Sequence, residues 1–132
     1  MKNNKNMKGD RVGTKFGYKF GYNRKDALSS VGEGWSKIIN NLYDAKPKSV
    51  LVIQVKEKFG GLRFYVGIAP EWYCDLIDYY EEQSLKTCEI CGKEGKLRTD
   101  LTWVKTLCDE DYNKIKEQFY GNRKEDIDNV NN

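Results

Sequence analysis

The sequence contains no histidine, only 2 prolines and no long apolar run in its 132 residues. Without histidine, the Ser-His-Asp and Cys-His types of catalysis are excluded, and so are metal sites that need imidazole ligands. The longest apolar stretches, such as Val50 to Val55, are far shorter than the ~20 residues of a membrane-spanning helix. The polar start of the chain also lacks the apolar segment of a signal peptide. We therefore expect a soluble, cytoplasmic protein that does not contact a membrane.

The chain suits one compact domain, but its charge is unevenly distributed. Hydrophobic residues make up 39% of the sequence, enough for a core, and the net charge is only +3. Residues 1–25 alone carry eight lysines and arginines against the single acidic Asp10, which leaves the remainder acidic. We expect residues 1–25 to form a flexible basic arm, and either an anionic partner such as nucleic acid or simple solvation explains its charge.

A short tandem repeat follows in the arm, Lys15-Phe-Gly-Tyr and then Lys19-Phe-Gly-Tyr. Aromatic rings interleaved with cations can stack on bases while pairing with phosphates. The same aromatic side chains, Phe16, Tyr18, Phe20 and Tyr22, could instead pack against the domain. The sequence leaves both interpretations open.

Hydrophobic periodicity predicts an α+β fold for residues 26–86. Trp35, Ile38, Ile39 and Leu42 fall on one face of a helix over residues 33–44. A second helix is predicted over residues 71–83, with the buried stripe Tyr73, Leu76, Ile77 and Tyr80. Between them, two β-prone runs around Gly60-Gly61 predict an antiparallel hairpin over residues 49–68. We expect a single small domain in which this hairpin packs on helices.

A two-residue loop at Gly60-Gly61 would set the register of the hairpin. Lys58 would then face Arg63, and Lys56 would face Tyr65. Glu57 would be the one charged residue on the predicted core face. The apolar residues of that face are Ile53, Val55, Phe59, Leu62, Phe64, Val66 and Ile68. The predicted outer face comprises Gln54, Lys56, Lys58, Arg63, Tyr65 and Gly67.

The outer face combines cations with an aromatic ring. Lys56, Lys58 and Arg63 could hold phosphates while Tyr65 stacks on a base, so these four residues are the candidate ligand-binding site. A solvated sheet face, whose charges prevent aggregation, is the alternative explanation. The favoured ligand is a small phosphate-bearing molecule such as a nucleotide.

The last third of the chain carries a metal-binding pattern. Cys88 and Cys91 lie on a Cys-x-x-Cys-Gly turn, and Cys108 opens a predicted helix whose stripe is Tyr112, Ile115 and Phe119. Zinc is the predicted cofactor, held in a treble-clef-like finger over residues 87–120, with a polar tail at 121–132. Asp111 is the favoured fourth ligand. Cys74, which lies on the second helix, is its competitor.

Residues Gly34 to Tyr112 resemble a widespread family of small, uncharacterised phage and prophage proteins. The resemblance rests on the motif Gln54-Val-Lys-Glu-Lys-Phe-Gly-Gly-Leu-Arg-Phe-Tyr65, on Ser84-Leu-Lys-Thr-Cys-Glu-Ile-Cys-Gly92 and on Lys105-Thr-Leu-Cys-Asp-Glu110. The family pattern commonly has histidine where this chain has Asp111. The resemblance implies phage origin but no particular activity.

Together these features predict a non-enzymatic accessory protein, of the kind phages use in counter-defence, that sequesters a small signalling nucleotide. A first alternative is nucleic-acid binding through the arm and through Lys96, Arg98 and Lys105. A second is inhibition of a host protein through the exposed aromatics Trp72 and Tyr79. Neighbouring acidic residues such as Glu81-Glu82 are explained more simply as a solvent-exposed helix face than as catalytic acids. An enzyme is therefore not expected. Pairing of hairpin edges could produce a dimer.

Overall fold

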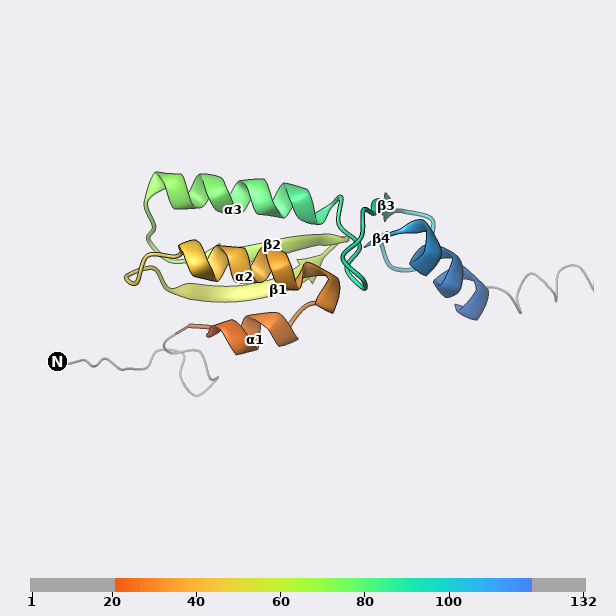
Figure 1. Cartoon of the computed structure of the whole chain (residues 1–132), viewed down its shortest axis with the longest axis horizontal. Coiled ribbons are helices and arrows are strands. Elements are labelled where there is room, and N and C mark those ends of the chain that lie inside the picture. Colours follow the sequence, from red (N-terminus) through yellow and green to blue (C-terminus); the bar gives the residue numbers. More distant parts are fainter. Residues whose placement is uncertain (1–20, 120–132) are drawn as a thin grey trace, which may run out of the picture.

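The computed structural model describes residues 21–119, and the arm repeat up to Phe20 and the tail lie outside this range. The elements are α1 (Arg24–Ser29), the 3-10 turn η2 (Glu33–Trp35), α2 (Ser36–Ala45), β1 (Val52–Lys58), β2 (Gly61–Val66), α3 (Glu71–Ser84), β3 (Lys96–Arg98), β4 (Lys105–Leu107) and a C-terminal helix over residues 109–119. Strands β1 and β2 form one antiparallel sheet, and β3 and β4 form another (Figure 1). The α+β class is confirmed. Within residues 21–119, no helix combines the length and apolarity that crossing a bilayer requires.

Both predicted core helices are confirmed. Trp35, Ile39 and Leu42 on the α2 side are completely buried, and so is Tyr73 on α3. The phenol of Tyr73 donates a hydrogen bond to the carbonyl oxygen of Leu42 at 2.6 Å, which ties the two helices together inside the core. Burial raises the pKa of this phenol to about 12. The stripe of each helix therefore faces the sheet, as the 3.6-residue period predicts.

Helix α1 was not predicted from the sequence, and it begins inside the range assigned to the basic arm. The side chain of Asn23 caps it by accepting a hydrogen bond from the amide of Asp26 at 2.8 Å. Ala27 is its one fully buried residue. The helix has only six residues and a narrow apolar face, so periodicity alone could not reveal it.

The hairpin turns one residue earlier than predicted. Its two-residue loop is Phe59-Gly60, and both residues have positive φ angles, 53° and 85°. This is the backbone of a type I′ turn, which suits the twist of a hairpin. Lys56 consequently lies opposite Arg63, and Lys58 lies opposite Gly61. The predicted pairing of Lys58 with Arg63 is wrong.

A register shift between Val52 and Gln54 changes the core face as well. Val52 is buried, whereas Ile53 is 41% exposed, because the irregularity turns Ile53 outward. Phe59 in the turn is 69% exposed, and Ile68 beyond the end of β2 is 98% exposed. The prediction that these three side chains face the core is wrong, although Val55, Leu62 and Phe64 are buried as predicted.

Candidate metal centre

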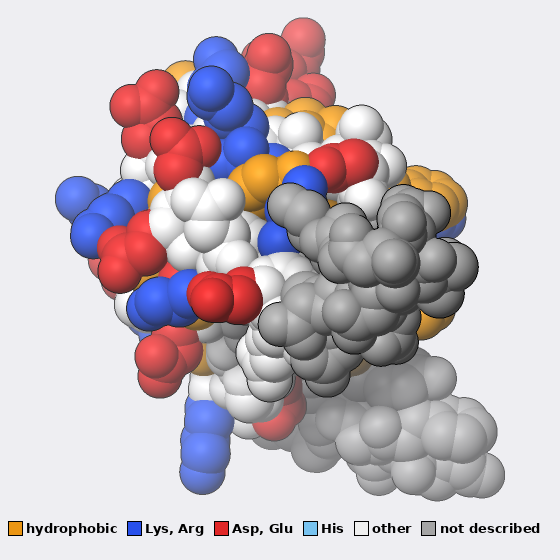
Figure 2. All heavy atoms as spheres, turned by 90° about the vertical axis from the view of Figure 1, so that its right-hand side faces the viewer, with side chains coloured by type: hydrophobic (Ala, Val, Ile, Leu, Met, Phe, Trp, Pro, Cys, Tyr) orange, Lys and Arg blue, Asp and Glu red, His pale blue; other side chains and the backbone are white. Residues whose placement is uncertain are grey.

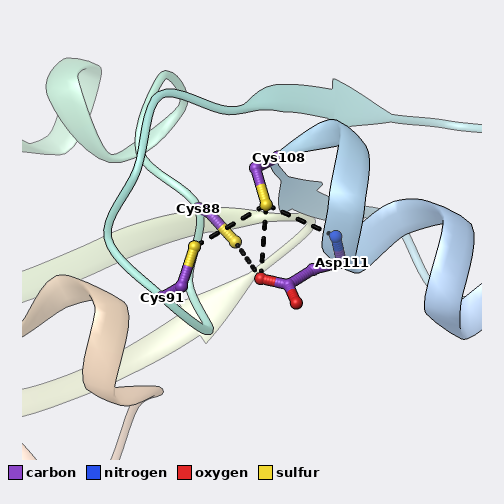
Figure 3. Close-up of side chains that lie close together, drawn as sticks. All are labelled: Cys88, Cys91, Cys108 and Asp111. Carbon is purple, nitrogen blue, oxygen red and sulfur yellow. Dashed lines mark hydrogen bonds between the residues drawn. The ribbon is translucent and has the colours of Figure 1, made fainter.

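Three cysteines and one aspartate converge where the last helix meets the Cys-x-x-Cys turn (Figure 3). One potential ligand atom from each of Cys88, Cys91, Cys108 and Asp111 lies within 4.8 Å of the others. Gly92 follows the turn with a φ of 85°, as the predicted metal knuckle requires. Cys108 directly precedes the C-terminal helix, and Asp111 lies in its first turn. The structure thus brings together all four predicted ligands.

The distances between these atoms suit a small tetrahedral ion. The sulfur atoms of Cys91 and Cys108 are 3.6 Å apart, and four ligands around zinc with Zn–S bonds of about 2.3 Å would place two sulfurs roughly 3.7 Å apart. Oδ2 of Asp111 lies 3.2 Å from the sulfur of Cys88 and 3.3 Å from that of Cys108. The four residues therefore lie close enough together to hold one metal ion.

The electrostatics of the cluster also favour a cation. Hydrogen bonds from Cys88 and Cys91 hold the pKa of the Asp111 carboxyl below its usual range. The backbone amide of Lys93 acts to lower the pKa of Cys91, but desolvation and the neighbouring acidic groups outweigh it and raise that pKa to about 12. A positive charge beside the Cys91 thiol would favour its ionised form. A divalent cation held by this group would supply that charge.

Cys74, the competing fourth ligand, is excluded from this group. It lies exposed on α3, and its sulfur contacts the carbonyl oxygen of Ala69 at 3.9 Å. Asp111, and not Cys74, therefore lies close enough to the three cysteines to be a fourth potential ligand.

The metal knuckle is docked against the segment that enters α2, a contact that sequence reasoning missed. The amide of Gly34 donates to the carbonyl oxygen of Glu89 at 2.7 Å, and the amide of Gly32 donates to the Glu89 carboxylate at 3.0 Å. A β-carbon on Gly34 would overlap the carbonyl oxygen of Cys88. Only glycine permits this close approach. The Gly-Glu-Gly sequence before Trp35 is the one feature of the sequence that indicates such a contact.

The tip of the first hairpin forms the second support of the metal region. The hydroxyl of Thr106, on β4, donates to the carbonyl oxygen of Gly60 at 2.7 Å and is completely buried. A β-carbon on Gly60 would lie 2.5 Å from the side chain of Leu97 on β3. The finger is therefore joined to the α+β core at two separate places.

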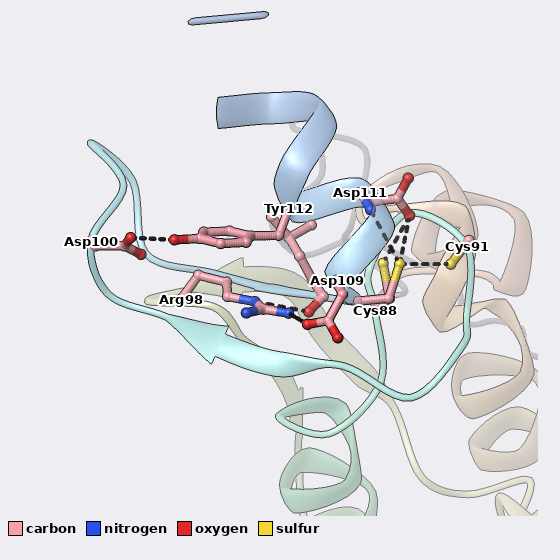
Figure 4. A network of polar contacts seen from close by, with 9 residues as sticks. Cys88, Cys91, Arg98, Asp100, Asp109, Asp111 and Tyr112 are labelled. Carbon is pink, nitrogen blue, oxygen red and sulfur yellow. Dashed lines mark hydrogen bonds and ion pairs between the residues drawn. The ribbon is translucent and has the colours of Figure 1, made fainter. Parts of the chain in front are cut away.

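A polar network positions the helix that carries Asp111 (Figure 4). Arg98 on β3 donates to the Asp109 carboxylate at 2.7 Å and to the carbonyl oxygen of Leu107 at 3.1 Å. Its guanidinium also lies 4.2 Å from the ring centroid of Tyr112, whose hydroxyl donates to Asp100. These contacts fix the first turn of the helix and so fix the orientation of Asp111.

Basic side chains of the finger are mostly paired with acids. Arg98 pairs with Asp109 at 2.7 Å, and Lys105 lies 3.9 Å from the buried carboxylate of Glu89. Figure 2, which views the molecule from the end carrying the finger, shows acidic and basic side chains intermixed there. The side chains of residues 21–119 that are visible at this end therefore do not form the single-sign surface that favours nucleic-acid binding through Lys96, Arg98 and Lys105.

The predicted ligand-binding residues lie on the outer face of the first hairpin, away from the cysteines. Lys56 lies directly opposite Arg63. The ammonium of Lys56 is 5.9 Å from the ring centroid of Tyr65, and that of Lys58 is 5.6 Å from the ring of Phe59. No ion pair between residues 21–119 includes Lys56, Lys58 or Arg63. In this part of the chain, no carboxylate therefore neutralises these cations at ion-pair distance.

No family model, curated protein or solved structure matches this chain. The resemblance to phage proteins therefore stays a prediction, and functional inference rests on the geometry of the two sites.

Proposed function

We propose that Cys88, Cys91, Cys108 and Asp111 bind one zinc ion that stabilises the fold. The observation that carries this proposal is the convergence of the four ligand atoms within 4.8 Å. Thiolates favour zinc over magnesium or calcium, and a tetrahedral set of three sulfurs and one oxygen suits it. The Cys88–Cys91 turn is followed by the hairpin of β3 and β4 and then by the helix over residues 109–119. This order of elements supports a treble-clef-like description of the finger.

The proposed role of zinc is structural because the protein supplies four ligands, which leaves no open position for a reacting water. The two docked contacts, at Gly34 and at Gly60, would transmit the metal's binding energy to the core. When bound, zinc supplies charge neutralisation and a cross-link between residues far apart in the sequence. In isolated fingers such binding contributes on the order of 10 kcal/mol to folding.

Chelation tests this role. Adding a strong chelator to the purified protein should lower its melting temperature, and added zinc should restore it. Cys88→Ser should have the low melting temperature without chelator. Cys74→Ser is the matched control, because Cys74 is exposed and outside the cluster, and it should behave like the natural chain. A melting temperature that is indifferent to chelator would contradict the proposal.

We further propose that the protein is a non-enzymatic binder of a phosphate-bearing ligand. The supporting observation is that Lys56 and Arg63 lie side by side across the strands, and neither forms an ion pair with another residue of the range 21–119. Like charges directly opposite each other on a sheet are unfavourable, and a phosphate between them would reverse that sign. Tyr65, 41% exposed on the same face, supplies a ring on which a base can stack.

A thermal-shift panel of mono-, di- and cyclic nucleotides tests this second proposal. A ligand present at 100 times its dissociation constant stabilises the folded state by about 2.7 kcal/mol, which is readily detected. Lys56→Ala and Arg63→Ala should abolish the shift. Lys37→Ala is the matched control, because Lys37 lines a separate cavity of about 470 Å³ between α2, α3 and the knuckle. A shift lost only in Lys37→Ala would place the ligand in that cavity instead.

A single strand of nucleic acid is the second candidate ligand, and one observation favours it. The aromatic rings of Phe59 and Tyr65 are exposed, and each lies beside a lysine. Small molecules usually bind in concave pockets, whereas stacked bases can follow an open face. Affinity for oligonucleotides that falls steeply with salt and exceeds that for mononucleotides would favour the strand. The phage accessory role and inhibition of a host protein through Trp72 and Tyr79 remain predictions.

A further inference from the structure

The three cysteines of the candidate metal centre differ in their access to solvent. Cys88 is completely buried and Cys108 is only 6% exposed, whereas Cys91 is exposed. Cys91 also lies in the wall of the cavity of about 470 Å³ between α2, α3 and the knuckle. Of the three, Cys91 is therefore the one that a small reagent dissolved in water can reach most directly.

A second sulfur lies next to that of Cys91. The sulfurs of Cys91 and Cys108 are 3.6 Å apart and come from two different segments, the knuckle turn and the residue directly before the C-terminal helix (Figure 3). A disulfide bond has a length of about 2.05 Å, so the two atoms need to approach by roughly 1.5 Å. The sulfur of Cys88 contacts Oδ2 of Asp111 at 3.2 Å instead. This arrangement favours Cys108 as the disulfide partner of Cys91.

An exposed thiolate beside a second cysteine is the setting in which cysteine oxidation is reversible. Peroxides react with the thiolate, and a neighbouring cysteine then converts the oxidised sulfur into a disulfide. Cysteines bind zinc as thiolates. Binding of the proposed ion would therefore hold Cys91 in its reactive form at an exposed position.

We propose that Cys91 is a site of oxidation by hydrogen peroxide and that the product is a disulfide bond between Cys91 and Cys108. This inference rests on the proposed zinc site. The Cys91 thiolate attacks one peroxide oxygen and breaks the O–O bond, which gives a sulfenic acid and one hydroxide. The Cys108 thiolate then attacks the sulfenic sulfur and displaces a second hydroxide. The two sulfurs lose two electrons in total, and the two peroxide oxygens gain them.

This oxidation also removes the proposed ion. After the disulfide forms, only the Cys88 thiolate and the Asp111 carboxylate remain as anionic ligands of the cluster. Structural zinc sites almost always have four protein ligands, so two do not retain the ion. The knuckle and the C-terminal helix, which the ion would hold together, are then joined by the disulfide instead.

Mass spectrometry of Cys74→Ser tests this step, because the variant keeps all four cluster residues and lacks the other exposed thiol. During treatment with hydrogen peroxide, dimedone traps sulfenic acids, and it should label Cys91 about tenfold or more above Cys88 and Cys108. Without dimedone, fragmentation of tryptic peptides should show a bond between Cys91 and Cys108. Native mass spectra should show one zinc ion lost for each disulfide formed, and dithiothreitol with added zinc should restore the starting mass.

The natural chain provides the matched control. Its Cys74 is exposed but lies outside the cluster, so it should be labelled by dimedone without joining a disulfide inside the chain. The bond between Cys91 and Cys108 should form in the natural chain as it does in Cys74→Ser. A disulfide that includes Cys74 in place of this bond would overturn the inference.

The zinc content before peroxide is added separates this inference from the proposed function. If one zinc ion is bound at the start, and peroxide then leaves the cysteines reduced with the ion in place, the oxidation site is overturned and the metal site stands. A bond between Cys88 and Cys91 overturns the pairing in the same way. If no zinc is bound at the start, the metal site and the oxidation site are both overturned.

Discussion

The indole Nε1–H of Trp35 donates a hydrogen bond to the carbonyl oxygen of Thr87 at 2.9 Å. Trp35 is completely buried just before α2, and Thr87 directly precedes Cys88, the first potential metal ligand. The core and the candidate metal centre therefore share a bond between residues 52 positions apart in the sequence. Folding of the core and binding of metal should consequently be coupled.

Replacing this tryptophan measures the coupling. Trp35→Phe keeps most of the buried ring but leaves the Thr87 carbonyl without its donor, which should lower the free energy of unfolding by about 1–3 kcal/mol. Urea denaturation gives this value, and competition with a zinc indicator gives the metal affinity. If the variant loses stability but binds zinc as tightly as the natural chain, the two regions are not coupled through this bond.

Gly34→Ala should weaken the docking of the knuckle. The added β-carbon would overlap the carbonyl oxygen of Cys88, so either the knuckle or the entry to α2 must move. We expect a loss of about 1–3 kcal/mol in the free energy of unfolding, the range typical of overpacking, together with weaker zinc binding. Gly67→Ala is the matched control, because the atom nearest to its β-carbon would be 4.0 Å away. Equal effects of the two substitutions in urea denaturation would contradict the docking.

Phe59→Asn should stabilise the hairpin. Phe59 adopts a φ of 53° in the turn although its side chain is 69% exposed, so a bulky residue occupies a left-handed conformation without much burial in return. Asn-Gly is a preferred pair for a type I′ turn, and the gain should be about 0.5–1 kcal/mol. Thermal unfolding measures it. A lower melting temperature would show that the contact of Phe59 with Lys58 matters more than the turn.

Glu81→Gln should stabilise the protein at neutral pH. Burial raises the pKa of Glu81, although its hydrogen bond from the amide of Phe64 and the nearby Arg63 act to lower it. A carboxyl whose pKa is higher in the folded than in the unfolded state favours folding when protonated, and this contribution disappears as pH rises through the folded pKa.

Glutamine can still accept the hydrogen bond without a charge. The melting temperature of Glu81→Gln should thus exceed that of the natural chain at pH 7, and the difference should shrink toward pH 4. A difference that does not change with pH would contradict this.

The local elements of the fold could be predicted because local patterns encode them. The apolar stripe from Trp35 to Leu42 predicts its helix, and the spacing of Cys88 and Cys91 predicts the knuckle. The hairpin register could not be predicted, because Gly60-Gly61 has the composition of a two-residue turn, whereas Phe59-Gly60 begins with a bulky residue that such turns disfavour. In the predicted register, each residue of the first strand from Gln54 to Lys58 faces a partner two positions away from the observed one. Because side chains alternate with a period of two, most of them were still predicted on the correct face of the sheet.

The arrangement of the finger on the core could not be predicted. Gly34 touches Cys88 and Gly60 touches Leu97, and both contacts join residues far apart in the sequence. The outward orientation of Ile53 depends on the register shift between Val52 and Gln54, which no sequence pattern predicts. The exposure of Phe119, which was predicted to lie in a buried stripe, reflects the lack of a facing element among residues 21–119 at the end of the C-terminal helix. Each of these features is set by tertiary packing.

Native mass spectrometry of the freshly purified protein provides the most direct test of the metal centre. We predict the mass of one chain plus one zinc ion, retained in Cys74→Ser and lost in Cys88→Ser and Cys108→Ser. A metal-free mass for the natural chain under reducing conditions, or zinc that remains bound in both cluster variants, would contradict a zinc site formed by Cys88, Cys91, Cys108 and Asp111.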